Sequence, residues 1–169
     1  MFIHGWSEKK VQMKWSFFHA TKEDSTPIKR LLDLVSRREI CIVSMILDKN
    51  QYPYQWESIH SLYNEIVGKL LSQCEKRNFL TNQPICFIAS RRETNKNLNK
   101  NFITTLQHYH SEQVWMEIKI ISPKESNGLE VVDTISYAIY KKYEENNLEF
   151  YSLIKNKILL EKVYHQNFN

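Results

Sequence analysis

Two aspartates stand at places in this sequence where a carboxylate could bind a metal ion. Asp48 directly follows the apolar run 40–47, and Asp133 stands among apolar residues near the start of a helical pattern over 128–145. Mg²⁺ is typically bound by one or two carboxylates together with oxygen atoms of a phosphate substrate, and Mn²⁺ accepts similar ligands. We therefore expect Asp48 and Asp133 to be both catalytic residues and ligands of Mg²⁺ or Mn²⁺.

Basic residues follow a second apolar run, 84–90. Arg91 and Arg92 come directly after this run, and Lys96 lies a few residues further on. Ligands of α/β proteins collect beyond the carboxyl ends of parallel strands, so these three side chains are expected to bind the substrate phosphate. The alternative is that the stretch 90–100 is simply a solvated, basic helix face.

Each candidate also has a purely structural interpretation. An acid after a strand, such as Asp48, is common where the chain turns. Asp133 near a helix start gains from the helix macrodipole without any metal. His19 precedes a polar loop and is expected either as a catalytic base or as a structural histidine bonded to a loop carbonyl.

The composition excludes several classes of site. The chain has 169 residues, a net charge of +4 and only three glycines, which excludes a P-loop and a GxGxxG nucleotide site. Three scattered cysteines do not form a disulfide framework or a zinc motif, and we expect buried, reduced thiols in a cytoplasmic protein. The sequence contains no apolar run long enough to span a membrane and no secretory signal, so no membrane partner is expected.

Apolar runs and helical patterns alternate along the chain. They predict a single α/β domain, 1–169, with a largely parallel sheet. The first two predicted strands are nearly continuous in apolar residues, which indicates burial on both faces, and the third alternates like an edge strand. Strands are predicted at 40–47, 84–90 and 114–121, with a further strand possible in 10–20; helices are predicted at 25–38, 54–77, 93–110, 128–145 and 148–155.

The helical pattern near the C-terminus is rich in tyrosine and lysine. Tyr137, Tyr140 and Tyr143 recur every three residues beside Lys141 and Lys142. This mixture occurs in surfaces on which nucleic-acid bases stack. Packing of the rings in the core, with the phenol groups reaching water, explains the pattern equally well.

Two segments, FFHATKEDSTPIKRLLDLV (17–35) and GLEVVDTISYAIYKKYEENNLEFYSLIKNKI (128–158), resemble the domain-of-unknown-function 3800 family over about residues 10–160. The resemblance implies a ribonuclease-H-like fold, a mixed, mostly parallel sheet flanked by helices. It also implies a carboxylate cluster that binds two divalent ions for phosphodiester hydrolysis. Asp133 matches the late aspartate of the family, and His19 matches its histidine.

The sequence departs from the family pattern at three places. MFIHGWSEKK stands where the family begins with a strand ending in Asp-Glu-Ser-Gly, Ser90 stands in place of an aspartate, and Glu130 in place of a glutamine. A domain truncated at its N-terminus is therefore expected, either a nuclease or a degenerate relative. The alternative is a non-enzymatic module that binds nucleic acid or protein, and a homo-oligomer that completes the sheet is a further expectation.

Overall fold

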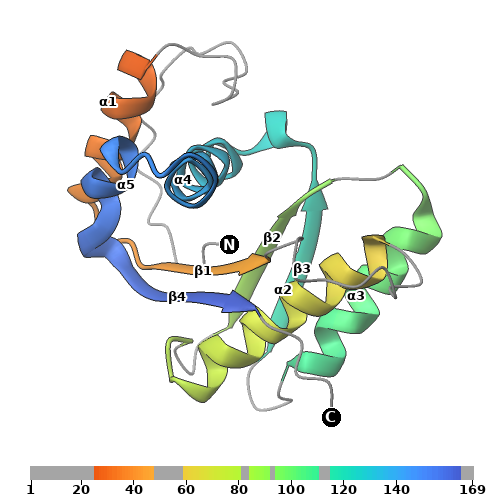
Figure 1. The fold of residues 1–169 in the computed structure, drawn as a ribbon. Coiled ribbons are helices and arrows are strands. Elements are labelled where there is room, and N and C mark those ends of the chain that lie inside the picture. The colour runs from red at the N-terminus through yellow and green to blue at the C-terminus, as the bar shows by residue number, and fades with distance from the viewer. Residues whose placement is uncertain (1–24, 48–58, 81–83, 92–93, 111–114, 165–169) are drawn as a thin grey trace. The chain divides into compact units, whose positions relative to one another are not determined.

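The computed structural model describes residues 25–47, 59–80, 84–91, 94–110 and 115–164 (Figure 1). The α/β class is confirmed, and every predicted helix and strand within these ranges is present. The strand proposed for 10–20 lies outside the described residues. In chain order the elements are α1 (Ser25–Ser36), β1 (Ile42–Leu47), α2 (Ile59–Lys76), β2 (Ile85–Ser90), α3 (Lys96–Tyr109), β3 (Met116–Ile121), the 3-10 turn η3 (Pro123–Glu125), α4 (Asn127–Glu145), α5 (Glu149–Ile154), the 3-10 turn η4 (Lys155–Lys157) and β4 (Ile158–Tyr164).

The described strands form two sheets of two strands each, where the sequence predicted one larger sheet. β1 pairs with β4, and β2 pairs with β3. The β2–β3 pair is parallel, because Ile85 N donates to Trp115 O at 2.9 Å and Arg91 N donates to Ile121 O at 2.7 Å. β4 was not predicted, since ILLEKVY has neither strict alternation nor a flanking turn signal.

The prediction that β2 is covered on both faces is wrong. Ile85, Phe87 and Ala89 are buried, whereas Cys86 is exposed and Ile88 keeps 38 % of its surface accessible. A continuous apolar run shows that a strand is hydrophobic, but the number of covered faces depends on which elements pack above and below it. In this strand only alternate side chains are buried.

The described residues divide into two compact units. The first unit comprises the described parts of Met1–Ile42, Ile88–Arg91 and Ile120–Leu159. The second unit comprises the described parts of Val43–Phe87, Arg92–Lys119 and Leu160–Asn169. None of the described helices has the length and apolar character needed to cross a lipid bilayer.

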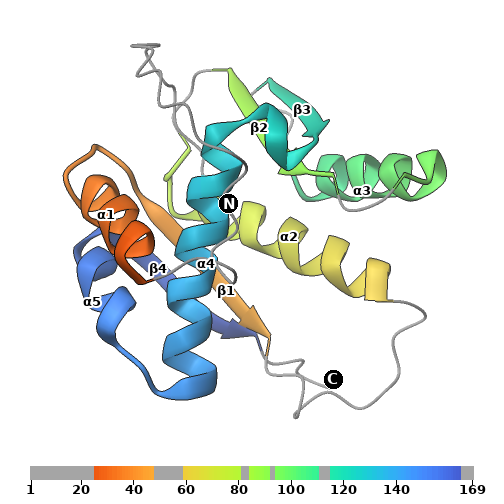
Figure 2. The same ribbon diagram turned by 90° about the horizontal axis from the view of Figure 1, so that it is seen from above.

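In the first unit, α1 packs against α4 and α5 (Figure 2). Ile28, Leu32 and Val35 lie three or four residues apart along α1, so they share one face of the helix, and all three are buried. Lys29 Nζ lies 2.5 Å from Glu149 Oε1 and ties α1 to α5 at the rim of this core.

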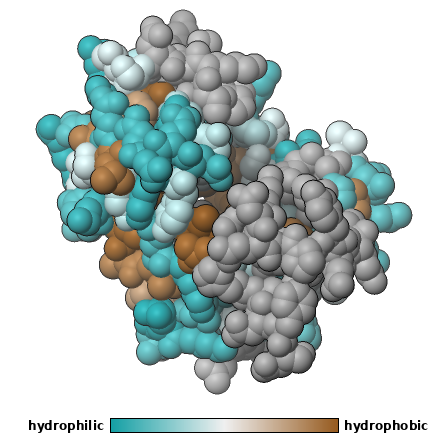
Figure 3. Space-filling model, in the orientation of Figure 1, coloured by the Kyte–Doolittle hydropathy of each residue, from teal (hydrophilic) through white to brown (hydrophobic). Residues whose placement is uncertain are grey.

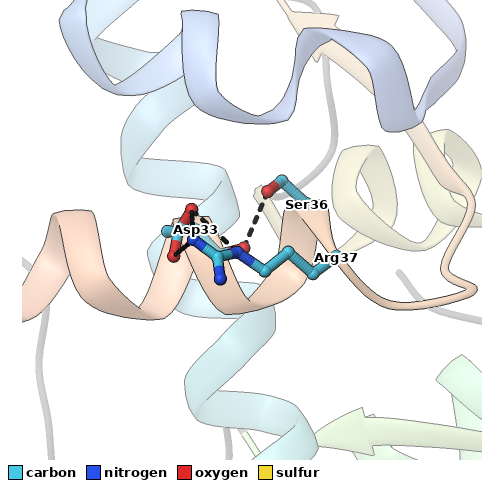
Figure 4. Close-up of polar contacts among 3 residues, drawn as sticks. All are labelled: Asp33, Ser36 and Arg37. Atoms are coloured by element: carbon cyan, nitrogen blue, oxygen red, sulfur yellow. Dashed lines mark hydrogen bonds and ion pairs between the residues drawn. The ribbon is translucent and has the colours of Figure 1, made fainter.

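The end of α1 is held by polar contacts of its own (Figure 4). Arg37 Nη2 lies 2.9 Å from Asp33 Oδ2, and Ser36 Oγ donates to Asp33 O at 2.7 Å. Beyond the helix, Lys157 Nζ donates to Arg38 O at 2.7 Å, so η4 covers a carbonyl at the end of α1.

In the second unit, α2 and α3 lie side by side and run in the same direction (Figure 1). Tyr63 stacks on Phe102, with ring centroids 5.9 Å apart. Gly68 lies against the ring of Tyr109, and further along both helices Glu75 forms an ion pair with His110. From one contact to the next, the residue numbers increase in both helices together, which shows that α2 and α3 are parallel.

Candidate functional site

Asp133 lies in the second turn of α4, where the sequence placed it. α4 begins at Asn127, directly after η3, which itself follows β3. The Asp133 side chain is half-buried. Since the carboxyl end of β3 leads through one short turn into α4, the helix start belongs to the same compact unit as that strand end.

Ser90 and Arg91 lie in the same compact unit as Asp133. The bond from Arg91 N to Ile121 O joins the carboxyl end of β2 to that of β3. Ser90 is half-buried and Arg91 is exposed. The first unit therefore contains one predicted metal ligand, Asp133 in the second turn of α4, and one predicted phosphate-binding residue, Arg91 directly after β2.

The other predicted site residues lie elsewhere. Lys96 is the first residue of α3, is exposed, and belongs to the second unit. His19, Asp48 and Arg92 are outside the described residues, so their predicted roles remain predictions.

Two half-buried carboxylates lie in the first two turns of α4. Glu130 and Asp133 are three residues apart on one helix, and residues at this spacing are neighbours on its surface. Within the described ranges, no group of three or more His, Cys, Asp or Glu side chains could hold a metal ion. The pair suits a Mg²⁺ or Mn²⁺ site with one or two carboxylates and further oxygens from phosphate and water.

The tyrosines of α4 divide between the core and the surface. Tyr137 packs against Phe150 of α5, with ring centroids 5.7 Å apart, while Tyr140 keeps 52 % of its surface accessible. Lys142 Nζ lies 4.9 Å from the ring centroid of Tyr143 and 3.9 Å from that of Tyr151. The packing interpretation is confirmed for Tyr137, and the cation–π contact of Lys142 with Tyr151 links α4 to α5.

A polar cluster that the sequence pattern does not predict joins α2 to β4 in the second unit. Lys69 Nζ lies 2.6 Å from Glu65 Oε1 and bonds to Tyr164 Oη, which in turn donates to Glu65 Oε1 at 3.1 Å. Burial lowers the pKa of Lys69, but its bonds to Glu65 and Tyr164 outweigh this and hold the pKa above its usual value. The Glu65–Lys69 spacing of four was visible in the sequence; the approach of Tyr164 was not.

The same cluster acts on Tyr109 of α3. Burial raises the pKa of Tyr109, and the negative charge of Glu65 raises it further. Lys69 is the main opposing influence. The phenol therefore stays protonated at neutral pH, which suits a packing residue and not a catalytic base.

The cysteines differ from prediction. Cys41 and Cys86 are exposed, so the expectation that all thiols are buried is wrong for these two; only Cys74 is buried, with 2 % of its surface accessible. Cys41 precedes β1 and Cys86 points to the open face of β2, positions that an apolar run alone does not reveal. Burial raises the pKa of the Cys74 thiol to about 11, so it is a poor nucleophile at neutral pH.

Stability should fall between about pH 8.5 and pH 11, partly through Cys74. Its pKa is higher in the folded chain than in the unfolded one, so its contribution is complete below the unfolded value and disappears as the pH rises through 11. We expect Cys74→Ala to be less stable than the parent at pH 7. Between about pH 8.5 and pH 11, the free energy of unfolding of Cys74→Ala should fall less than that of the parent, by as much as about 2 to 3 kcal/mol.

Urea unfolding at a series of pH values measures this difference, with Cys86→Ala, at an exposed position, as the matched control. Equal pH dependence in the parent and in Cys74→Ala would show that the thiol has no such role.

Comparison of the chain with protein-family models, curated protein sequences and solved structures gives no significant match.

Proposed function

We propose that the chain is a ribonuclease-H-like domain of metal-dependent nuclease ancestry that hydrolyses phosphodiester bonds in nucleic acid. One observation carries the proposal. The carboxyl ends of β2 and β3 belong to the same compact unit as the first turns of α4. Arg91 directly follows β2, and Asp133 lies on α4. Such strand ends are the usual ligand-binding edge of α/β folds.

The residues have distinct roles in this proposal. Asp133, with Glu130 beside it on α4, would hold Mg²⁺ or Mn²⁺, and Asp48 is the expected second carboxylate. The ion, when bound, would stabilise the charge that develops on the phosphate oxygens. Arg91 would bind the phosphate with its guanidinium group, whose planar donors match two phosphate oxygens. His19 remains the predicted histidine of the site.

The test is cleavage of nucleic acid by matched charge-removing variants. Purified protein is incubated with single-stranded and duplex DNA and RNA in the presence of Mn²⁺ or Mg²⁺. We expect Asp133→Asn to cleave at least about 100-fold more slowly than the parent, because even the groups that only orient a metal ligand commonly contribute 10- to 100-fold. Glu144→Gln, an exposed change on the same helix, should cleave like the parent. Equal cleavage by the parent and Asp133→Asn would contradict the proposed role of Asp133.

A non-enzymatic binding module is the second candidate, and Ser90 favours it. This half-buried residue ends β2, at the position where the similar family has an aspartate. If the parent cleaves no substrate but binds nucleic acid in a salt-sensitive way, this candidate replaces the first. Salt-insensitive binding to a protein would instead identify a protein partner.

A further inference from the structure

α3 contains no Asp or Glu, whereas each of the other described α-helices contains at least one. The exposed residues of α3 are basic or neutral and polar. They recur three and four residues apart, so they share one side of the helix. These residues, named here the α3 face, are Lys96, Asn97, Lys100, Asn101, Thr104, Gln107 and His108.

The opposite side of α3 is packed, which holds the α3 face outward. Phe102 and Leu106 are buried, and Phe102 contacts Tyr63 of α2 and Phe87 of β2 at centroid distances of 5.9 and 6.4 Å. Asn95 caps the helix start by accepting a bond from Asn97 N at 2.9 Å. Where the start of α3 shows in Figure 3, at the right of the view, the surface is mostly hydrophilic.

Neither of the two lysines of the α3 face, Lys96 and Lys100, forms an ion pair with any residue that the structure describes. Several basic residues of other elements are paired with carboxylates: Lys29 with Glu149, Arg37 with Asp33, Lys69 with Glu65, Lys119 with Glu117 and Lys141 with Glu145. Among the described residues, no carboxylate neutralises the positive charge of Lys96 and Lys100.

The helix macrodipole adds to this charge. Lys96 lies in the first turn of α3, where the dipole is positive, and this turn has no acidic residue to balance it. Cations at this end are electrostatically unfavourable unless an anion binds near them. The arrangement is thus complementary to a negatively charged partner.

The neutral residues indicate an extended partner. Asn97, Asn101, Thr104 and Gln107 present amides and a hydroxyl, groups that bind phosphate oxygens, sugars and base edges in nucleic-acid complexes. The helix is about 21 Å long, enough to follow several phosphates. The α3 face carries no exposed apolar side chain, whereas helices that lie on membranes insert apolar residues.

We propose that the α3 face binds the phosphodiester backbone of nucleic acid. The proposal shares its ligand class with the proposed function, but it concerns residues of the second unit and does not depend on Asp133. Lys96 and Lys100 make the ionic contacts, and the asparagines, Thr104 and Gln107 position the backbone along the helix. This surface would bind the polymer whether or not the chain cleaves it.

The test measures binding of a fluorescein-labelled DNA duplex of about two helical turns by anisotropy, over a series of salt concentrations, without divalent metal. Replacing Lys96 and Lys100 together by Gln should weaken binding at least tenfold at low salt. It should also reduce the slope of log K against log salt by nearly two, since each phosphate contact contributes about 0.9. The matched control replaces the exposed Lys155 and Lys162 by Gln, for the same loss of charge, and should bind within about twofold of the parent.

A second variant separates ionic from neutral contacts. Asn97→Ala with Asn101→Ala should weaken binding while leaving the salt slope unchanged, because neutral groups release no counterions. Circular dichroism checks that α3 remains folded in each variant.

Three results would overturn the proposal: no binding of DNA or RNA by the parent, equal weakening in the Lys155/Lys162 control, or binding to phosphatidylserine vesicles in place of nucleic acid. Duplex binding is measured without divalent metal and cleavage with it. Absent cleavage would therefore count against the nuclease proposal, and absent binding would count against the role of the α3 face.

Discussion

Leu106→Ala should lower the free energy of unfolding by about 2 to 5 kcal/mol. Leu106 lies on the inner side of α3 and has 0 % of its surface accessible, in the compact unit that contains α2. Removing three carbon atoms there loses the free energy of their burial and leaves a cavity that close-packed neighbours fill only in part. Urea unfolding followed by circular dichroism measures the change.

The neighbouring residue provides the control. Gln107 is exposed on the same turn of α3, and Gln107→Ala should change stability by less than about 0.5 kcal/mol. A similar loss in both variants would mean that the helix itself, and not its buried side, is sensitive to substitution. A loss below about 1 kcal/mol in Leu106→Ala would contradict the packing of α3 described above.

Gly68→Ala should also destabilise the protein, by about 1 to 3 kcal/mol. A Cβ atom at Gly68 would lie 2.2 Å from Cδ2 of Tyr109 and 2.8 Å from two further ring atoms. Alanine is favoured over glycine within helices by up to about 1 kcal/mol, but the clash is expected to exceed this gain. α2 and α3 must move apart or the ring must turn.

The effect of Gly68→Ala on the free energy of unfolding should change sign when the Tyr109 ring is absent. In a Tyr109→Ala background, Gly68→Ala removes no contact and keeps its helix propensity, so it should stabilise by up to about 1 kcal/mol. A double-mutant cycle over these two positions measures the coupling. Gly128→Ala is the control: its Cβ would meet only Ser126 Oγ, at 3.3 Å, and a serine side chain can rotate away. Additive effects of Gly68→Ala and Tyr109→Ala would refute the close approach of α2 and α3.

The sequence by itself determined the secondary structure well. Ile28, Leu32 and Val35 repeat at helical spacing, and α1 buries these residues. The predicted strands 40–47, 84–90 and 114–121 correspond to β1, β2 and β3, and the helix that contains Asp133 begins within one residue of its predicted start. These features are local: side-chain periodicity and the residues at element ends act over a few positions, so they can be recognised in one sequence.

Only the tertiary structure decided which of these elements meet. β4 pairs with β1 across more than a hundred residues, Tyr164 reaches Lys69 and Glu65, and Cys86 faces outward while Cys74 is enclosed. Each of these features depends on contacts between segments that are distant in the sequence. Such contacts form because the fold as a whole buries apolar surface, and no local sequence pattern specifies them. The candidate site also depends on contacts between distant segments. The sequence predicted Asp133, Arg91 and Lys96 for one site, and the fold places the first two in one compact unit and Lys96 on the α3 face of the other.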